Sequence, residues 1–124
     1  MKVFASFILA FNGYSICSTT RAKDHGEMGQ IGLPGGKLDP GESAHAAAKR
    51  EAKEEGWNIP FVDSNPFYEQ IVEGELIQWF YGINASPLEE YKEKGRIKPI
   101  LSSVGEVRNC GFGNDQALKA FINL

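Results

Sequence analysis

The sequence predicts a layered α/β domain, in which strands flank a central helix and a second helix follows at the end of the chain. Residues Glu42–Glu55 contain no glycine or proline and are rich in alanine, which favours a helix, and Gly56 follows as a stop signal. Runs of strand-forming residues lie on either side of this helix, at Val3–Phe11 and Leu76–Ile83. Because the chain has 124 residues, we expect one domain that spans residues 1–124.

The first part of the chain indicates a β-hairpin. The first strand runs into Asn12-Gly13, the commonest two-residue hairpin signal, and Tyr14–Thr19 returns as a second strand. The polar segment Arg21–Gly32 is expected to be a loop. After the helix, a further strand is predicted at Phe67–Val72.

Three more elements follow these strands. The polar segment Pro87–Lys94 is predicted to be a loop or a helical turn. Ile97–Leu101 is predicted to be a short edge strand, because Pro99 lacks a backbone donor. Asn114–Leu124 is predicted to be the C-terminal helix, with Asn114 or Asp115 near its N-cap.

Composition and charge exclude several classes of protein. The formal net charge of −3 offers no broad basic field for duplex nucleic acid. No run approaches the ~18 apolar residues of a membrane-spanning helix, and a strand explains the apolar start of the chain better than a signal peptide does. Cys17 and Cys110 form no CxxC pair, so we expect free thiols in a reducing, cytoplasmic environment.

The late acids of the predicted helix fall on its apolar side. At about 100° per residue, four alanines form one face, Glu51 and Glu55 fall on that same face, and Glu54 lies at its margin. The simpler interpretation is a solvated charged face, but such a face should lie opposite the alanines. Neighbouring carboxylates beside a packed face repel one another and are costly to desolvate unless a cation joins them. Oxygen ligands suit Mg²⁺ or Mn²⁺ rather than zinc, so the pattern predicts a divalent metal site.

Two adjacent glycines precede this helix. Gly35-Gly36 lets the backbone approach closely and adopt a positive φ, so that a carbonyl oxygen could reach the metal. Pro34 and the following Asp-Pro-Gly turn are expected to stiffen the loop that leads into the helix. Taken alone, the glycines would be equally consistent with an ordinary turn.

Together, these residues resemble the Nudix box, G-x5-E-x7-R-E-U-x-E-E-x-G-U, in which U is a bulky aliphatic residue. The charged and glycine positions of the box that match are Gly36, Glu42, Arg50, Glu51, Glu54 and Glu55. The preceding "LPGG" is also typical of the Nudix hydrolase family.

The chain departs from the box at its end. Ala52 stands where a larger aliphatic residue is usual, Gly56 comes one position early, and Trp57 and Asn58 occupy the last two positions. We expect this change to alter the C-terminal cap of the helix but not the metal ligands.

The resemblance implies a fold and an activity. The fold would be a Nudix-type α/β/α sandwich, with a mixed β-sheet, the Nudix loop-helix-loop and a C-terminal helix. The activity would be MutT-like: a pyrophosphohydrolase that needs Mg²⁺, or alternatively Mn²⁺, and cleaves a phosphoric anhydride bond in a nucleoside diphosphate linked to another group. Its partner would be a small nucleotide, and the protein would be a monomer or a homodimer.

The resemblance also assigns roles to residues. It implies metal ligation by Glu51, Glu54, Glu55 and a carbonyl of Gly35 or Gly36. Arg50 would hold the glutamates by ion pairing, and Glu42 would be a structural acid. A bound cation would acidify water and stabilise the charge that develops on the phosphorus centre.

The general base is left open by the sequence. Glu54 or Glu55 could serve, and Glu93 in "YKEKG" resembles a Lys-Glu pair of the oxidised-nucleotide branch of the family. Three further acids are rivals for this role: Glu89, Glu90 and Glu106.

The choice of substrate has weaker sequence signals. Residues typical of hydrolases of ADP-ribose, dinucleoside polyphosphates, NADH and coenzyme A are missing. The short chain and Asn114 at the start of the last helix are similar to members that hydrolyse nucleoside triphosphates, so we expect a dNTP, unmodified or oxidised. Asn114 could bind the edge of the base, and Phe80, Trp79 or Phe112 could stack on it. Two histidines are expected to be solvated: His25 and His45.

Two alternatives to this function remain. The chain could hydrolyse ADP-ribose, a nucleotide sugar or a dinucleoside polyphosphate, or it could be a Nudix-like module that binds a nucleotide without cleaving it. The second alternative is disfavoured, because such a module has no reason to keep three glutamates at metal-binding spacing.

Overall fold

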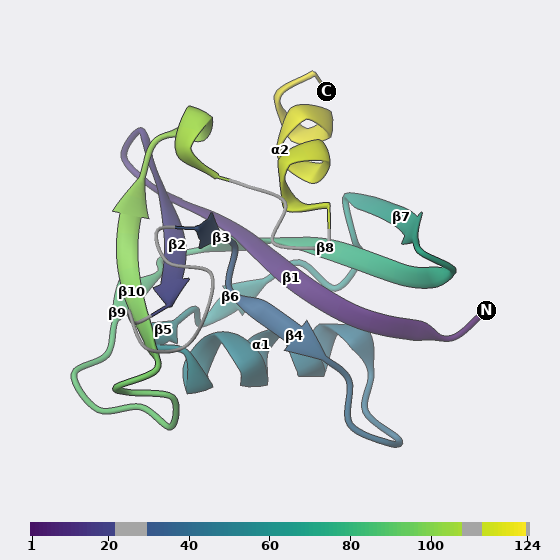
Figure 1. Cartoon of the computed structure of the whole chain (residues 1–124), viewed down its shortest axis with the longest axis horizontal. Helices are drawn as coiled ribbons and strands as arrows, with labels where there is room; N and C mark the ends of the chain where they lie inside the picture. Colours follow the sequence, from purple (N-terminus) through teal and green to yellow (C-terminus); the bar gives the residue numbers. More distant parts are fainter. Residues whose placement is uncertain (22–29, 108–112, 124) are drawn as a thin grey trace.

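A mixed β-sheet forms the centre of the molecule, and one helix packs on each side of it (Figure 1). The computed structural model describes residues 1–21, 30–107 and 113–123. The sheet strands are β1 (Val3–Asn12), β2 (Ser15–Arg21), β3 (Ile31–Gly32), β4 (Gly35–Lys37), β6 (Phe61–Val62), β7 (Tyr68–Val72), β8 (Glu75–Ile83) and β10 (Ile97–Ser102). The other elements are α1 (Ala44–Glu54), the short pair β5 (Trp57–Asn58) and β9 (Ser86–Pro87), the 3₁₀ helix η1 (Val104–Glu106) and α2 (Asn114–Ile122).

Strand β1 lies in the middle of the sheet. It pairs antiparallel with β2 and β4 and parallel with β8, and residues 5–10 are all buried. A strand that is covered on both faces has a continuous apolar sequence, which explains why this segment shows no alternation. In the pairing with β4, Gly35 lies opposite Phe7 and Gly36 lies opposite Ser6. The central strand therefore fixes the position of both glycines.

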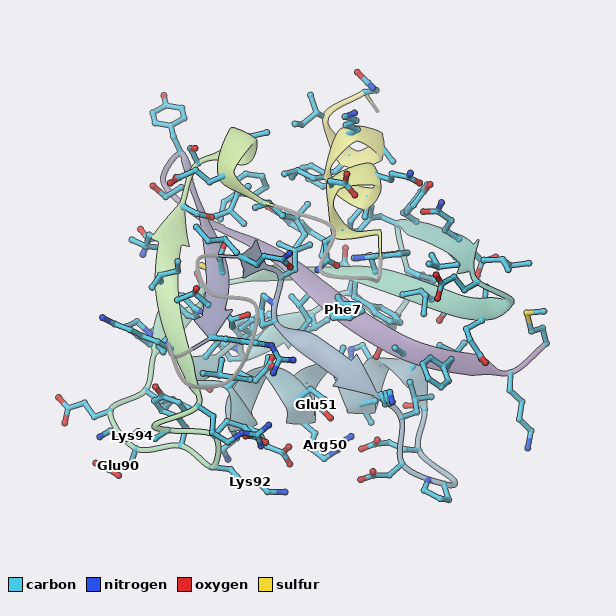
Figure 2. The ribbon with its side chains drawn as sticks, viewed as in Figure 1. Phe7, Arg50, Glu51, Glu90, Lys92 and Lys94 are labelled. Carbon is cyan, nitrogen blue, oxygen red and sulfur yellow. The ribbon has the colours of Figure 1, made fainter. Side chains whose placement is uncertain are left out.

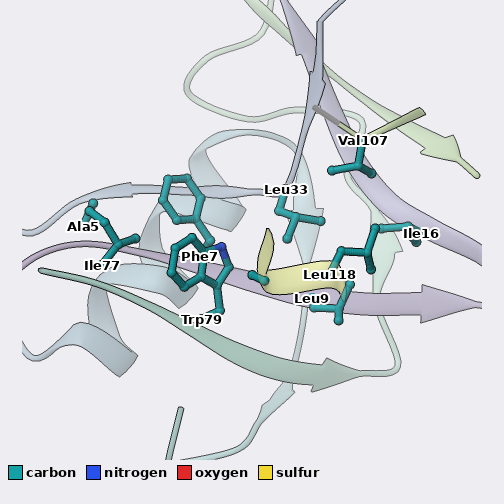
Figure 3. Close-up of a cluster of buried hydrophobic side chains, with 10 residues drawn as sticks. Ala5, Phe7, Leu9, Ile16, Leu33, Ile77, Trp79, Val107 and Leu118 are labelled. Carbon is teal, nitrogen blue, oxygen red and sulfur yellow. The ribbon is translucent and has the colours of Figure 1, made fainter. Parts of the chain in front are cut away.

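Successive side chains of β1 enter two separate cores, because side chains alternate between the faces of a strand. Phe7 packs with Trp79 of β8 and Leu118 of α2 on one face (Figure 3). Ile8 packs on the other face with Phe80 and the buried alanines of α1. The two neighbouring aromatic residues of β8 thus point to opposite sides of the sheet.

Helix α1 begins two residues later than the sequence predicts. Ser43 is its N-cap, and its hydroxyl accepts a hydrogen bond from the backbone N–H of Ala46 at 3.1 Å. The predicted apolar face is confirmed, since the buried residues of the helix are Ala47, Ala48 and Ala52. Their small side chains let the helix backbone approach the sheet closely.

The end of α1 is shaped by Gly56. Its φ is +105°, and a Cβ at this position would lie 2.9 Å from ring carbons of Pro99 in β10. Trp57 then turns inward, and its indole Nε1–H donates a hydrogen bond to the carbonyl of Ser18 at 2.8 Å. Glu55 is the C-cap residue and is only 8% exposed. The early glycine therefore gives a tight contact between the end of α1 and β10.

The long elements agree with the sequence prediction. Strands β1, β2, β7, β8 and β10 and helix α2 lie within a few residues of their predicted bounds, and β10 is an edge strand, as Pro99 indicated. The short strands β3, β4, β5, β6 and β9 are not predicted, because segments of two or three residues carry no detectable period. In the segment predicted as a loop or helical turn, Pro87 belongs to β9, and the residues that follow form a loop of bends and turns.

Cys17 is buried and free, as expected, and burial raises the pKa of its thiol to about 11. Cys110, His25 and Phe112 lie outside the described residues. In the part of the chain that the structure describes, no helix has the length and apolar character needed to cross a bilayer.

Candidate active site

A cavity of about 320 Å³ lies where α1, strands β1–β4, the loop before β10 and the start of α2 meet. Its volume is typical of small-molecule sites. Three acids line it: Glu51, Glu55 and Glu93. Three basic residues also line it: Arg21, Lys37 and Arg96. The cavity therefore combines carboxylates that suit a cation with cationic groups that suit an anionic ligand.

The carboxylate of Glu51 lies directly against Gly36. A Cβ at position 36 would lie 2.7 Å from Cδ of Glu51 and 2.8 and 3.0 Å from its two carboxylate oxygens. Figure 2 shows Glu51 on α1, on the side of the helix that faces β4. Burial raises the pKa of Glu51, against the opposing effect of Arg50. Any side chain at position 36 would displace this carboxylate from the cavity wall, so the position requires glycine.

Glu55 is held by the other glycine. Its Oε1 accepts a hydrogen bond from the backbone N–H of Gly35 at 2.8 Å. The φ of Gly35 is +149°, and a Cβ there would lie 2.3 Å from the carbonyl oxygen of Ser6. Burial, together with the nearby charges of Glu51 and Glu93, raises the pKa of Glu55 to about 8. A buried carboxylate next to two other acids is an unfavourable arrangement that a cation would relieve.

Arg50 organises the acids on the outer side of the helix. Its guanidinium donates to Glu42 at 2.7 and 2.9 Å, to Glu51 at 3.1 Å and to both oxygens of Glu54 at 3.3 Å. It also donates to the backbone carbonyl of Lys37 at 3.1 Å, which ties α1 to β4. The hydrogen bond from Arg50 lowers the pKa of Glu42. The structure thus brings Arg50 together with every box glutamate except Glu55.

Glu54 does not line the cavity. Its carboxylate contacts Arg50 and lies 3.8 Å from Nζ of Lys92. Within residues 1–21, 30–107 and 113–123, no three His, Cys, Asp or Glu side chains lie close enough together to enclose a cation. The donors still fit a hard divalent cation, because the half-buried Glu51, the buried Glu55 and a Gly-Gly backbone adjoin the same space.

Among the acids considered as a general base outside the box, Glu93 is the one at the cavity. Its backbone N–H donates to the carbonyl of Glu54 at 2.8 Å, and its Oε2 accepts from Arg96 at 2.9 Å. Glu90 is 86% exposed and pairs with Lys94. Glu89 and Glu106 do not line the cavity either, and Glu106 instead accepts from the backbone N–H of Ser103.

Asn114 is a buried lining residue at the start of α2. Its Oδ1 accepts a hydrogen bond from the indole Nε1–H of Trp79 at 2.9 Å. An indole N–H can only donate, so this contact fixes the amide orientation and leaves the NH₂ group for other partners. Trp79 itself is fully buried.

Two expectations about side chains are corrected by the structure. Phe80 is 2% exposed in the core beneath α1 and does not line the cavity, so it is not placed to stack on a base. His45 is half-buried rather than solvated: its Nε2 is 2.9 Å from the carbonyl of Val62, and its ring packs edge-on against Phe80. Both side chains stabilise the contact between α1 and the sheet.

The lining residues that were not identified from the sequence include Phe7, Arg21, Gln30, Lys37 and Arg96. Lys37 directly follows the two glycines, which was an available signal. Gln30 has a buried Oε1 with no hydrogen-bond partner among the described residues. The others reach the cavity only through the pairing of distant strands, which leaves no local trace in the sequence.

Comparisons with known proteins identify the family and the fold of the chain. The family model described as NUDIX domain matches residues 1–95. A MutT NUDIX hydrolase from Burkholderia pseudomallei superposes with a TM-score of 0.69 at 18% identity, covering 97% of this chain and 98% of that one. A structure from a study of MutT from Aliivibrio salmonicida and Vibrio cholerae gives 0.70 at 16% identity and covers both chains completely.

A third solved structure, an ADP compounds hydrolase, gives a TM-score of 0.68 at 18% identity and covers 96% of this chain and 70% of that one. No curated protein sequence matches the chain. At these identities the structural matches establish the fold, whereas the family model establishes membership. The chain belongs to the NUDIX family. It has the predicted mixed-sheet fold with two helices, and its class is that of a Nudix pyrophosphohydrolase.

Proposed function

We propose that this protein hydrolyses a nucleoside triphosphate, an unmodified or oxidised dNTP, in a reaction that requires Mg²⁺. The observation that carries the proposal is the cavity, which places the carboxylates of Glu51 and Glu55 in the same space as cationic side chains. A polyphosphate is repelled by such acids unless divalent cations lie between them. The runner-up substrates are ADP-ribose, nucleotide sugars and dinucleoside polyphosphates.

The box residues would hold the cation. When bound by Glu51, Glu54, Glu55 and a carbonyl of Gly35 or Gly36, a divalent cation neutralises charge on the reacting phosphate groups. Arg50 keeps its shortest contacts, 2.7 and 2.9 Å, with Glu42, whereas both contacts with Glu54 are 3.3 Å. Glu54 can therefore turn toward the cavity while Arg50 stays anchored.

Glu93 is the residue that we assign as the general base. In the hydrolysis, the oxygen of water forms a bond to phosphorus and the anhydride P–O bond breaks, with its electron pair leaving on the departing phosphate. The proton of the water passes to the carboxylate of Glu93. The hydrogen bond from Glu93 N–H to the carbonyl of Glu54 supports this role, because it fixes the loop that carries the base against the end of α1.

Asn114 would select the base of the nucleotide. With Oδ1 engaged by Trp79, its NH₂ group offers only donors to a ligand. It therefore pairs with a carbonyl oxygen of a base and not with an amino group, which favours guanine over adenine. The unpartnered, buried Oε1 of Gln30 offers an acceptor in the same cavity. Phe7, rather than Phe80, supplies the aromatic part of the lining.

The test is release of phosphate products from a nucleotide panel in Mg²⁺, Mn²⁺ or EDTA. The panel holds dGTP, dATP, oxidised dGTP, ADP-ribose, nucleotide sugars and dinucleoside polyphosphates. We expect metal-dependent cleavage of dGTP or its oxidised form in preference to dATP, with the preference reversed in Asn114→Asp, in which the donor becomes an acceptor. Cleavage of ADP-ribose, nucleotide sugars or dinucleoside polyphosphates but of no dNTP would favour the runner-up substrates. Nucleotide binding without cleavage would indicate a non-catalytic module.

A further inference from the structure

Arg96 occupies an unusual position at the cavity. It lies just before β10, lines the cavity, and donates from Nη1 to Oε2 of Glu93 at 2.9 Å. Its side chain is 56% exposed, and Glu93 is its only side-chain partner among the residues that the structure describes. The guanidinium therefore retains its Nε–H and Nη2 donors for a ligand.

Two other cationic groups near the acids, Arg50 and Lys37, are less available. The donors of Arg50 are distributed over Glu42, Glu51, Glu54 and a backbone carbonyl, and Arg50 does not line the cavity. The ammonium of Lys37 lies 5.3 Å above the ring of Phe4. Arg96 is thus a cation with free donors that also contacts the acid we assign as the base.

The backbone around Arg96 is well fixed. Its N–H donates to the carbonyl of Glu93 at 2.9 Å, and Ile97 N–H donates to the same carbonyl at 2.9 Å. The hydroxyl of Tyr91 donates to the carbonyl of Ile97 at 2.9 Å. Only the Arg96 side chain has to move for its guanidinium to turn from Glu93 to another anion.

We propose that Arg96 is a phosphate-binding residue, and that the polyphosphate of the substrate takes its guanidinium from Glu93. A guanidinium binds phosphate through paired, charge-assisted hydrogen bonds, and a dianionic phosphate is a stronger partner than one carboxylate oxygen. The exchange leaves Oε2 of Glu93 free to accept the proton of the attacking water. This inference rests on the proposed function, since it gives the site a device that frees the base when substrate is bound.

The experiment is calorimetric binding of inorganic pyrophosphate in Mg²⁺, which needs no turnover. Arg96→Gln should weaken binding about tenfold or more, as expected for loss of charge-assisted hydrogen bonds. Arg96→Lys should restore part of the affinity, because it keeps the charge but not the paired geometry. The matched control is Lys94→Gln, which removes the same charge from the same loop. Lys94 pairs with Glu90 outside the cavity, in the outer part of the loop in Figure 2. The affinity of Lys94→Gln for pyrophosphate should therefore stay within about twofold of wild type.

Glu93→Gln tests whether Glu93 competes with pyrophosphate for the guanidinium of Arg96 or only holds that side chain in place. Removal of the carboxylate should tighten pyrophosphate binding, because Arg96 no longer has to leave an ion pair. In the Arg96→Gln background, the same change should give no such gain. On the nucleotide that is cleaved, Arg96→Gln should raise KM by about the same factor as it weakens pyrophosphate binding.

Equal pyrophosphate affinity in wild type and Arg96→Gln would overturn the inference, and so would the absence of pyrophosphate binding to the wild type. If Glu93→Gln tightens binding equally in both backgrounds, the effect is general electrostatics and the exchange is refuted. Failure of the proposed function would be seen separately, as the absence of metal-dependent cleavage across the nucleotide panel.

Discussion

Gly36→Ala should lower the activity of the protein while leaving it folded. The φ of Gly36 is outside the left-handed region, so alanine is allowed by the backbone, but its Cβ would lie 2.7 Å from Cδ of Glu51. Ordinary contact begins near 3.4 Å, so the carboxylate must retreat by about 0.7 Å. Displacement of this size exceeds the ~0.5 Å tolerance of a metal or catalytic site, and we expect kcat/KM to fall about 10- to 100-fold.

The fold should survive this change. Glu51 is a half-buried side chain that can move, so the free energy of unfolding should change by no more than about 1 kcal/mol. Gly35→Ala is the contrasting variant, because its Cβ would lie 2.3 Å from the carbonyl oxygen of Ser6 and 2.6 Å from Cα of Phe7, neither of which can yield. That variant should lose about 3 kcal/mol or more. Gly105→Ala is the matched control, since nothing lies within 4 Å of its Cβ.

The assay combines initial rates in Mg²⁺ with thermal unfolding of each variant. Wild-type activity in Gly36→Ala would refute the role given to the Glu51 carboxylate. A large loss of stability in Gly36→Ala, equal to that of Gly35→Ala, would refute the view that its clash is confined to a mobile side chain.

Further predictions concern the other acids and the buried thiol. Glu54→Gln and Glu55→Gln should each lower kcat by at least about 100-fold while the protein stays folded, as checked by rates and circular dichroism; full activity in both would refute the ligand assignment. Because burial raises the pKa of Glu55 to about 8, the folded protein in EDTA keeps a proton that the unfolded chain loses above about pH 4.3. The contribution of Glu55 to the free energy of unfolding should therefore fall as pH rises from about 4.3 to 8, and urea titrations should show a smaller decline in Glu55→Gln. In a Cys110→Ser background, Cys17 should resist a thiol reagent at neutral pH until the protein is unfolded, because it is buried and its pKa is raised to about 11; rapid labelling of the native state would contradict its placement.

Helix α1 could be predicted because its information is local. The alanine face and the acids upon it are separated by three and four residues, a spacing that helical geometry converts directly into proximity. Ala48 is fully buried and Glu55 is 8% exposed, in accord with that geometry. The resemblance to the Nudix box adds the roles of these residues, which geometry alone does not supply.

The opposite wall of the cavity could not be predicted in the same way. Its residues meet because β2 pairs antiparallel with β3 and β10 and β1 pairs antiparallel with β4, and strand order is not written in any local period. The misassignment of Phe80 has a related cause. Strand β8 is covered on both faces, so its sequence does not tell which of Trp79 and Phe80 faces α1. Arg96 was missed because its importance comes from contact with Glu93 at the cavity rather than from a motif.

The most direct test of the central claim is a Mn²⁺ titration followed by the electron paramagnetic resonance signal of the free ion. We expect wild-type protein to bind Mn²⁺ and Glu55→Gln to weaken binding by about tenfold or more, because a buried carboxylate ligand is lost. Glu90→Gln, which removes an 86% exposed acid paired with Lys94, should bind as wild type does. Equal Mn²⁺ affinity in wild type and Glu55→Gln, or a loss in Glu90→Gln as large as in Glu55→Gln, would contradict the claim that this cavity is a cation-dependent active site.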